Sequence, residues 1–179
     1  TTATLNLTAA TSAMNSYQYR CLVSGTCSPV ATSSAATLTI NTAPVVSADP
    51  SASTICAGNN TSFSVTASGT ALTYQWQESQ DAGSTWNALT NAGVYSTVTT
   101  ATLNLTAATS AMNSYQYRCL VSGTCSPVAT SSAATLTINT APVVSADPSA
   151  STICAGNNTS FSVTASGTAL TYQWQESQD

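Results

Sequence analysis

The sequence predicts an all-β chain in which one β-sandwich is repeated in tandem. Apolar and polar residues alternate with a period of two, and turn residues separate the alternating stretches. The stretch that begins at Thr1 begins again at Thr99, which gives a period of 98 residues, and residues 99–179 repeat residues 1–81 without a substitution. Because about 100 residues is the size of one small domain, we expect a string of equal units.

Five stretches of each unit have the alternation of a half-buried strand. In the first, Phe63 and Val65 alternate with polar neighbours, and in the second Tyr74 and Trp76 do the same. The predicted strands are, in order, residues 63–67, 72–76, 103–105, 115–121 and 134–138. Turns rich in glycine, asparagine and serine lie between them, and no stretch shows the period of an amphipathic helix. The unit is therefore expected to consist of strands.

Short proline-containing segments mark the ends of the unit. The segment 41–44 recurs at 139–142, and a proline beside a strand suits a boundary because it removes a ladder donor. We expect the C-terminal half of one unit at 1–42, a complete unit at 43–140 and the N-terminal half of the next at 141–179. Since neither half closes a core alone, we expect either a window on a longer filament or neighbouring chains that complete each other.

The composition excludes several classes of partner. Charged residues make up 4% of the chain, against about 25% in ordinary soluble domains, so the surface is expected to be neutral and rich in hydroxyl and amide groups. Two Lys or Arg residues in the whole chain cannot neutralise a phosphate backbone, which excludes nucleic acid. No apolar run approaches the roughly 18 residues of a membrane helix, so no membrane insertion is expected.

The unit offers few groups for catalysis. Its charged side chains are those of Asp49, Glu78, Asp81 and Arg118. General acid–base pairs and metal sites need convergent carboxylates or histidines, and strand alternation points Glu78 and Asp81 apart. The sequence therefore predicts no enzyme activity, no cofactor and no metal.

One turn matches a known structural motif. The stretch 79–86 fits the pattern S-x-D-x-G-x-T-W, which resembles the Asp-box of sialidases and other β-propellers. We expect Asp81 to bind backbone amides of a hairpin turn and Trp86 to fold back as an anchor. This reading makes both residues structural rather than catalytic.

The residues around Cys119 resemble those of immunoglobulin-like sandwiches. Tyr117 stands two places before Cys119, and Trp76 faces inward on an earlier strand. The resemblance implies that Trp76 is the core tryptophan and Tyr117 the corner tyrosine. Eleven residues before Trp76, where such domains carry the partner cysteine, this chain has Val65. Cys119 is thus expected either to be a small buried hydrophobe beside Val65 and Trp76 or to have a different partner.

Three motifs extend the resemblance over the whole 98-residue period. They are T-I-C-A-G at 54–58, Y-Q-W-Q at 74–77 and Y-Q-Y-R-C at 115–119. Together they resemble the immunoglobulin-like repeats of large secreted and cell-surface proteins of Bacteroidota. That resemblance implies export, tandem arrays and surface roles in adhesion or filaments, and it implies no catalysis.

The chain has three cysteines in each period. The six are Cys21, Cys27, Cys56, Cys119, Cys125 and Cys154. Their spacing lacks the paired C-x-x-C ends of zinc sites, so we expect disulfides and an oxidising, extracellular location. The preferred bridge joins Cys56 to Cys125. The alternatives are Cys56 to Cys119, or Cys56 to the last cysteine of an adjacent unit, which would staple neighbouring units together.

These features predict the structural repeat of an extracellular bacterial filament or adhesin stalk, stabilised by disulfides and by packing between neighbouring units or chains. The alternative is a repeated carbohydrate-binding module in which Trp86, Tyr95 and Tyr115 form a platform that stacks on glycans. The exposure of Trp86 and Tyr95 separates these hypotheses, since a stalk buries the rings and a glycan binder displays them. A third hypothesis, an accessory domain of a secreted hydrolase, requires a catalytic domain outside this sequence.

Overall fold

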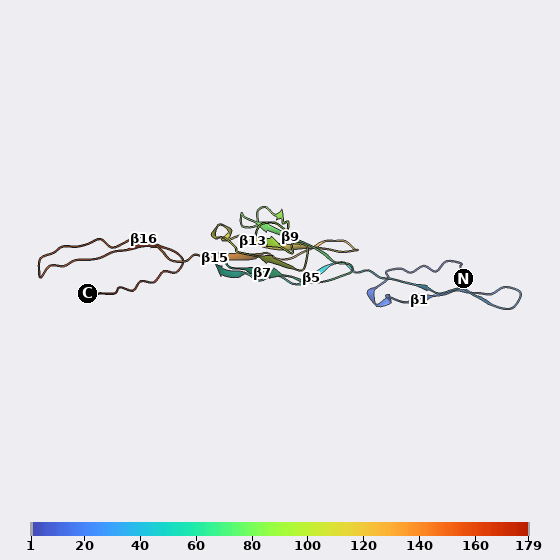
Figure 1. The fold of residues 1–179 in the computed structure, drawn as a ribbon. Coiled ribbons are helices and arrows are strands. Elements are labelled where there is room, and N and C mark those ends of the chain that lie inside the picture. Colours follow the sequence, from blue (N-terminus) through green and yellow to red (C-terminus); the bar gives the residue numbers. More distant parts are fainter. Residues whose placement is uncertain (1, 179) are drawn as a thin grey trace.

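The computed structural model describes residues 2–178, and it shows a slender chain with a thicker central body between two arms (Figure 1). The central body contains β5 (Val45–Ala48), β6 (Ser53–Cys56), β7 (Thr61–Ser64), β8 (Thr66–Ser68), β9 (Thr73–Ser79), β10 (Asn87–Ala88), β11 (Tyr95–Ser96), β12 (Thr102–Leu105), η2 (Ser110–Met112), β13 (Gln116–Ser122), β14 (Ala129–Thr130) and β15 (Ala134–Asn139). The all-β fold predicted from the alternation is confirmed.

The central body is a sandwich of two sheets. The larger sheet has the order β10-β9-β13-β15-β6, with β14 paired to the end of β13, and the smaller sheet has the order β11-β12-β7. β5 pairs with β8, which follows β7 after Val65, whereas β6 pairs in parallel with β15. The segment that contains β5 and β6 therefore crosses from one side of the sandwich, at β8, to the other side, at β15, and it closes that edge of the sandwich.

The core lies between the two sheets. Trp76 of β9, Leu103 of β12, and Tyr117 and Cys119 of β13 have no exposed surface. The other buried apolar residues are Phe63, Val65, Leu89, Val98, Leu105, Ala108, Met112, Val121, Ala134, Leu136 and Ile138. All of these residues lie in the central body, so this part encloses a core without help from the arms.

The predicted strands are present with shifted bounds. The first is divided into β7 and β8 at Val65, and the second extends as β9 to Ser79. The sequence pattern does not predict β5, β6, β10, β11 and β14, because these strands are short or lie at sheet edges and carry little apolar alternation.

The N-terminal and C-terminal arms contain isolated strand pairs. Their elements are η1 (Ser12–Met14), β1 (Gln18–Tyr19), β2 (Leu22–Val23), β3 (Ala31–Thr32), β4 (Ala36–Thr37), β16 (Val143–Ala146) and β17 (Thr164–Ser166). The pairs are β1 with β4, β2 with β3, and β16 with β17.

The arms show how the same sequence behaves without the second sheet. Leu103 and Leu105 are 0% and 1% exposed, whereas Leu5 and Leu7, which occupy the same places of the repeat, are 67% and 42% exposed. The stretch around Leu103 forms β12, but the identical stretch at 4–7 forms no strand. Because the local sequence is the same, this strand depends on tertiary packing rather than on intrinsic propensity.

Candidate functional site

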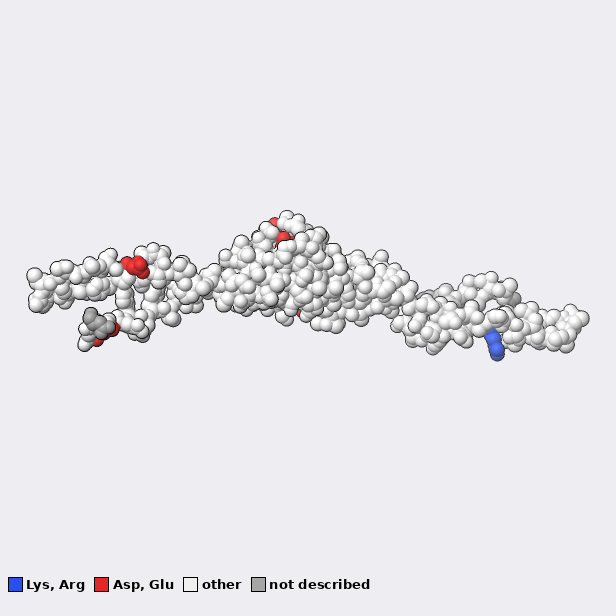
Figure 2. Space-filling view, in the orientation of Figure 1, with Lys and Arg blue, Asp and Glu red and all other residues white. Residues whose placement is uncertain are grey.

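The visible surface carries few charges. Figure 2 shows acidic side chains on the central body and the C-terminal arm and a basic one on the N-terminal arm, with uncharged residues over the rest of the described surface in that view. Within residues 2–178, no helix has the length and apolar content needed to cross a membrane. The same residues include no group of three His, Cys, Asp or Glu side chains placed to hold a metal ion.

Asp81 organises the turn between β9 and β10. Its Oδ1 accepts hydrogen bonds from the Ser79 hydroxyl (2.7 Å) and the Thr85 amide (2.8 Å), and its Oδ2 accepts one from the Thr85 hydroxyl (2.6 Å). The Oγ of Ser79, which is buried, accepts a further bond from the Gly83 amide at 2.8 Å. The bonds from Thr85 and Ser79 lower the pKa of Asp81 to about 2. The carboxylate is therefore engaged in holding the turn.

We expect Asp81→Asn to lower the melting temperature at pH 6, and we expect this difference from the wild type to vanish near pH 2. The folded pKa of about 2 lies below the ordinary 3.8, so the carboxylate stabilises the fold above about pH 4 and loses that effect as the pH falls through 2. Thermal unfolding of both proteins between pH 2 and 6 measures it. A difference that stays constant to pH 2 would contradict this role of the carboxylate.

Trp86 folds back over the same turn. Its Nε1 donates a hydrogen bond to the Gly83 carbonyl (3.0 Å), and the guanidinium carbon of Arg118 lies 4.1 Å from the centre of its ring. The Nε of Arg118 donates to Oε1 of Gln77 at 2.8 Å, which fixes the guanidinium on the ring. One face of Trp86 is thus covered by a cation and is not free to stack on a sugar.

Tyr95 is also engaged within the unit. Its hydroxyl donates to Oε2 of Glu78 and lies 3.2 Å from the hydroxyl of Tyr117, whose ring stacks on Phe63 at a centroid distance of 4.8 Å. Burial, and then the hydrogen bond to Glu78, raise the pKa of Tyr95 well above its usual value, and burial does the same for Tyr117. The three polar groups form a hydrogen-bonded cluster at the edge of the core. Tyr95 therefore presents no free platform.

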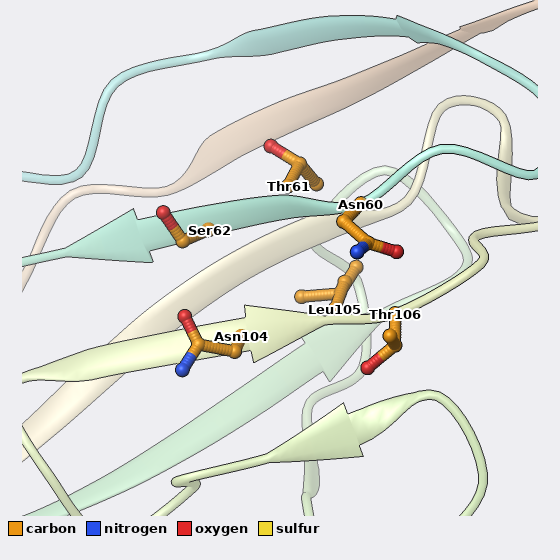
Figure 3. Close-up of a pocket in the computed structure, with 6 residues that line it drawn as sticks. All are labelled: Asn60, Thr61, Ser62, Asn104, Leu105 and Thr106. Carbon is orange, nitrogen blue, oxygen red and sulfur yellow. The ribbon is translucent and has the colours of Figure 1, made fainter.

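A hollow of about 540 Å³ lies on the outer face of the smaller sheet (Figure 3). It is lined by Asn60, Thr61, Ser62, Asn104, Leu105 and Thr106. Apart from Leu105, the lining consists of short hydroxyl and amide side chains without an aromatic ring or a charge, and Oδ1 of Asn60 is already bound to the Ala107 amide at 2.8 Å. It lacks the apolar walls and convergent polar groups of a ligand site.

The structure contradicts the predicted Cys56–Cys125 bridge within one unit. Cys56 is in register with Asn139, the last residue of β15, whereas Cys125 lies in the hairpin that follows Ser122, the last residue of β13. Because β13 and β15 are antiparallel, these positions are at opposite ends of the sandwich, on the order of 30 Å apart at a rise of about 3.3 Å per residue. A disulfide requires Cα atoms within about 7 Å, so the bridge cannot form.

The Cys56–Cys119 alternative fails for a related reason. Cys119 exchanges hydrogen bonds with Ser131, whereas Cys56 is in register with Asn139, so the two cysteines are on the order of 26 Å apart at a rise of about 3.3 Å per residue. Cys119 is enclosed in the core, in register with Trp76, and its Sγ lies 3.6 Å from the carbonyl oxygen of Leu120. Burial raises the pKa of its thiol to about 11. All six cysteines, namely Cys21, Cys27, Cys56, Cys119, Cys125 and Cys154, are free. Cys119 thus behaves as a small buried hydrophobe beside Trp76.

The linkers on both sides of the body make the same hydrogen bonds. The amide of Thr42 donates to Oγ1 of Thr70 (2.9 Å), and the carbonyl of Thr42 accepts from the Thr70 amide (3.1 Å). Thr140 and Thr168 repeat both bonds with the same lengths. Each linker is therefore tied to the turn that follows it by one bidentate contact, which recurs at both junctions.

Two glycines allow other segments to approach the linker closely. A Cβ on Gly69, whose φ is +146°, would lie 2.8 Å from the Leu72 side chain and 3.0 Å from Cα of Pro44. A Cβ on Gly123 would lie 2.8 Å from the Thr70 carbonyl oxygen and 3.1 Å from the side chain of Pro44. The turn after β8 and the hairpin after β13 therefore both pack against Pro44. The sequence marks both glycines as turn residues but does not show this contact.

Comparisons with known proteins agree with this architecture. The sequence family described as a domain of unknown function (DUF8696) matches residues 46–140. The I-band fragment I67–I69 of titin is similar in structure, with a TM-score of 0.50 and 20% identity over 60% of this chain and 36% of the titin chain. The N-terminal four immunoglobulin domains of Dscam1 are similar with a TM-score of 0.50 and 14% identity, over 60% of this chain and 27% of that chain.

These likenesses confirm an immunoglobulin-like sandwich, as the residues around Cys119 predict. At this level of identity they show the fold alone. The chain spans 36% of the length of the titin fragment and 27% of that of the four-domain Dscam1 fragment. No curated protein sequence matches the chain.

Proposed function

The chain belongs to the DUF8696 domain family, and we propose that its immunoglobulin-like unit is the structural repeat of an extracellular filament or adhesin stalk. In this proposal the unit at 43–140 is one link of a longer tandem array, as the exact repetition of the sequence suggests. An origin among bacterial surface proteins, which the sequence resemblance implies, belongs to the same proposal.

The duplicated junction is the observation that carries this proposal. Thr42 and Thr140 make identical pairs of hydrogen bonds to Thr70 and Thr168, so each linker is fixed to the turn that follows it. At the second junction this anchor comes directly after Asn139, the last residue of β15 in the preceding unit, which leaves little free chain between the two units. Packing of Gly69 on the proline of the linker adds a steric limit to bending. Successive units in an array would therefore be held at a fixed angle, which is what a stalk or filament needs.

The side-chain geometry supports the stalk over the glycan-binding alternative. Trp86 is covered on one face by Arg118, and the hydroxyl of Tyr95 is bonded to Glu78. Both rings are half-buried and are engaged in contacts within the unit. The scarcity of charge also suits lateral or end-to-end association, because bringing such surfaces together removes few charges from water and meets little repulsion.

A two-unit array, made by joining two copies of residues 43–140, tests the proposed stiffness. We expect small-angle X-ray scattering to show a single extended shape in which the two bodies keep a fixed separation. Thr70→Val in the second copy removes the hydroxyl that accepts from the linker amide and should broaden the distribution of shapes. Thr90→Val is the matched control, because Thr90 is exposed and its side chain has no hydrogen-bond partner among the described residues.

The array also tests the alternative. If the wild-type array scatters as two freely jointed bodies, or if the Thr70 and Thr90 variants behave alike, the stalk proposal fails. Retention of the array on immobilised glycans, lost in Trp86→Ala, would favour the carbohydrate-binding hypothesis instead.

A further inference from the structure

We propose that Cys56 of one unit and Cys125 of the following unit form a disulfide across each junction, so that the array is covalently stapled. This inference deepens the proposed function and rests on it, because the bridge exists only where one unit follows another. Of the three pairings for Cys56 that the sequence suggests, this is the one that the structure does not contradict.

Cys56 lies at the C-terminal end of its unit and is accessible. It is the last residue of β6, where Ile55 is turned towards the core and Cys56 is exposed. It is in register with Asn139, and the next amide, that of Ala57, donates to the Asn139 carbonyl at 2.8 Å. Cys56 is thus held beside the residue that directly precedes the Thr140 linker.

Cys125 lies at the N-terminal end of its unit, in the hairpin between β13 and β14. Gly123 packs against Pro44, and the amide of Thr124 donates to the Thr70 carbonyl at 3.0 Å, so the hairpin lies over the preceding linker. Cys125 follows directly and is half-buried. In the N-terminal arm, the equivalent hairpin between β2 and β3 points away from the body, towards the position that an earlier unit would occupy (Figure 1).

A short chain of contacts connects the two thiols across a junction. Cys56 pairs with Asn139, and the adjacent Thr140 is hydrogen-bonded to Thr168, which occupies the place of Thr70 in the following unit. The Thr70 position binds Thr124, the neighbour of Cys125. Cys56 of one unit and Cys125 of the following unit are thus the two cysteines that this chain of contacts connects. Cys56 is exposed at the end of a strand and Cys125 is half-buried in a hairpin, and a disulfide needs their Cβ atoms to approach to about 4 Å.

Formation of the bridge requires an oxidant, and a small disulfide such as oxidised glutathione supplies it. One cysteine thiolate attacks the small disulfide, forms a mixed disulfide and releases one small thiol. The thiolate of the second cysteine then displaces the other small thiol. The two cysteines lose two protons and two electrons in total, and the small disulfide takes them up to become two thiols.

The two-unit array allows a matched test, because its inner and outer cysteines differ only in position. After oxidation with glutathione disulfide at low protein concentration, we expect a mass lower by two hydrogens and a peptide that links Cys56 of the first copy to Cys125 of the second. Cys56→Ser in the first copy, or Cys125→Ser in the second, should abolish the link. Cys125→Ser in the first copy together with Cys56→Ser in the second should preserve it.

Two outcomes overturn the inference. The first is a pair of inner thiols that remain free, or carry only glutathione, while the unit is folded. The second is equal bridging by the inner and outer pairs, which would show random contact. An array that is extended in solution but has no disulfide would contradict the disulfide across the junction and leave the stalk proposal intact. An array that is freely jointed and has no disulfide would contradict both proposals.

Discussion

Replacing Trp76 with alanine is expected to destabilise the central body by about 3–5 kcal/mol, whereas the same replacement at Trp174 is expected to change its stability by less than about 0.5 kcal/mol. Trp76 has no exposed surface, and its Nε1 donates to the Thr100 carbonyl at 2.9 Å. Trp174 has the same local sequence but is 52% exposed in the C-terminal arm. Urea unfolding of the 179-residue chain, followed by far-ultraviolet circular dichroism, measures both changes.

The comparison is a controlled one because the two tryptophans share their neighbours in sequence. Any effect of local propensity or of the denatured chain is the same at both sites, so the difference isolates the burial of Trp76 between the sheets. Equal losses at the two positions would show that the C-terminal arm is also a packed structure, and they would contradict the exposure of Trp174.

The sequence predicted the layers of the sandwich because the alternation records which face of a strand is buried. Phe63, Trp76 and Tyr117 all lie at inward positions that the pattern predicts. The edge strands lay beyond prediction, since β6 and β10 are short and bury little apolar surface of their own. The Asp81 turn was predictable in detail, because its hydrogen bonds connect residues at most four positions apart.

The disulfide prediction failed because sequence patterns do not give the end of the sandwich at which each turn lies. The turn after Cys56 follows β6 and the hairpin that holds Cys125 follows β13, and both of these strands pair with β15. The turn and the hairpin nevertheless lie at opposite ends of the sandwich. The linker contact was missed for a similar reason. Thr42 and Thr70 are ordinary residues of a threonine-rich chain, and only the fold brings them together. Both features belong to the junction, where the proposed function also lies.

Two buried groups and one half-buried group of the central body are expected to make the unit sensitive to alkali. Burial raises the pKa of the Cys119 thiol from 9.0 to about 11, and burial also raises the phenol pKa of Tyr95 and Tyr117 above the ordinary 10.0. A group whose pKa is raised by folding stabilises the folded state when the pH is below its pKa in the unfolded chain. That stabilisation is lost as the pH rises above this value towards the pKa of the folded state. The free energy of unfolding should therefore begin to fall near pH 9 and fall more steeply above pH 10.

The slopes assign these losses to single residues, since each group contributes at most about 1.4 kcal/mol per pH unit. Cys119→Ala should flatten the fall between pH 9 and 11, and Tyr95→Phe should flatten it above pH 10 while weakening the cluster with Glu78 at neutral pH. Ile138→Val is the control, because it removes a buried methylene without a titratable group and should lower stability by about 0.5–1.5 kcal/mol at every pH.

Urea unfolding of residues 43–140 between pH 7 and 11.5 measures the slopes. Parallel curves for the wild type and Tyr95→Phe would show that the Tyr95 phenol ionises as readily in the folded unit as in the unfolded chain, and the hydrogen-bonded cluster would then have no part in holding its proton.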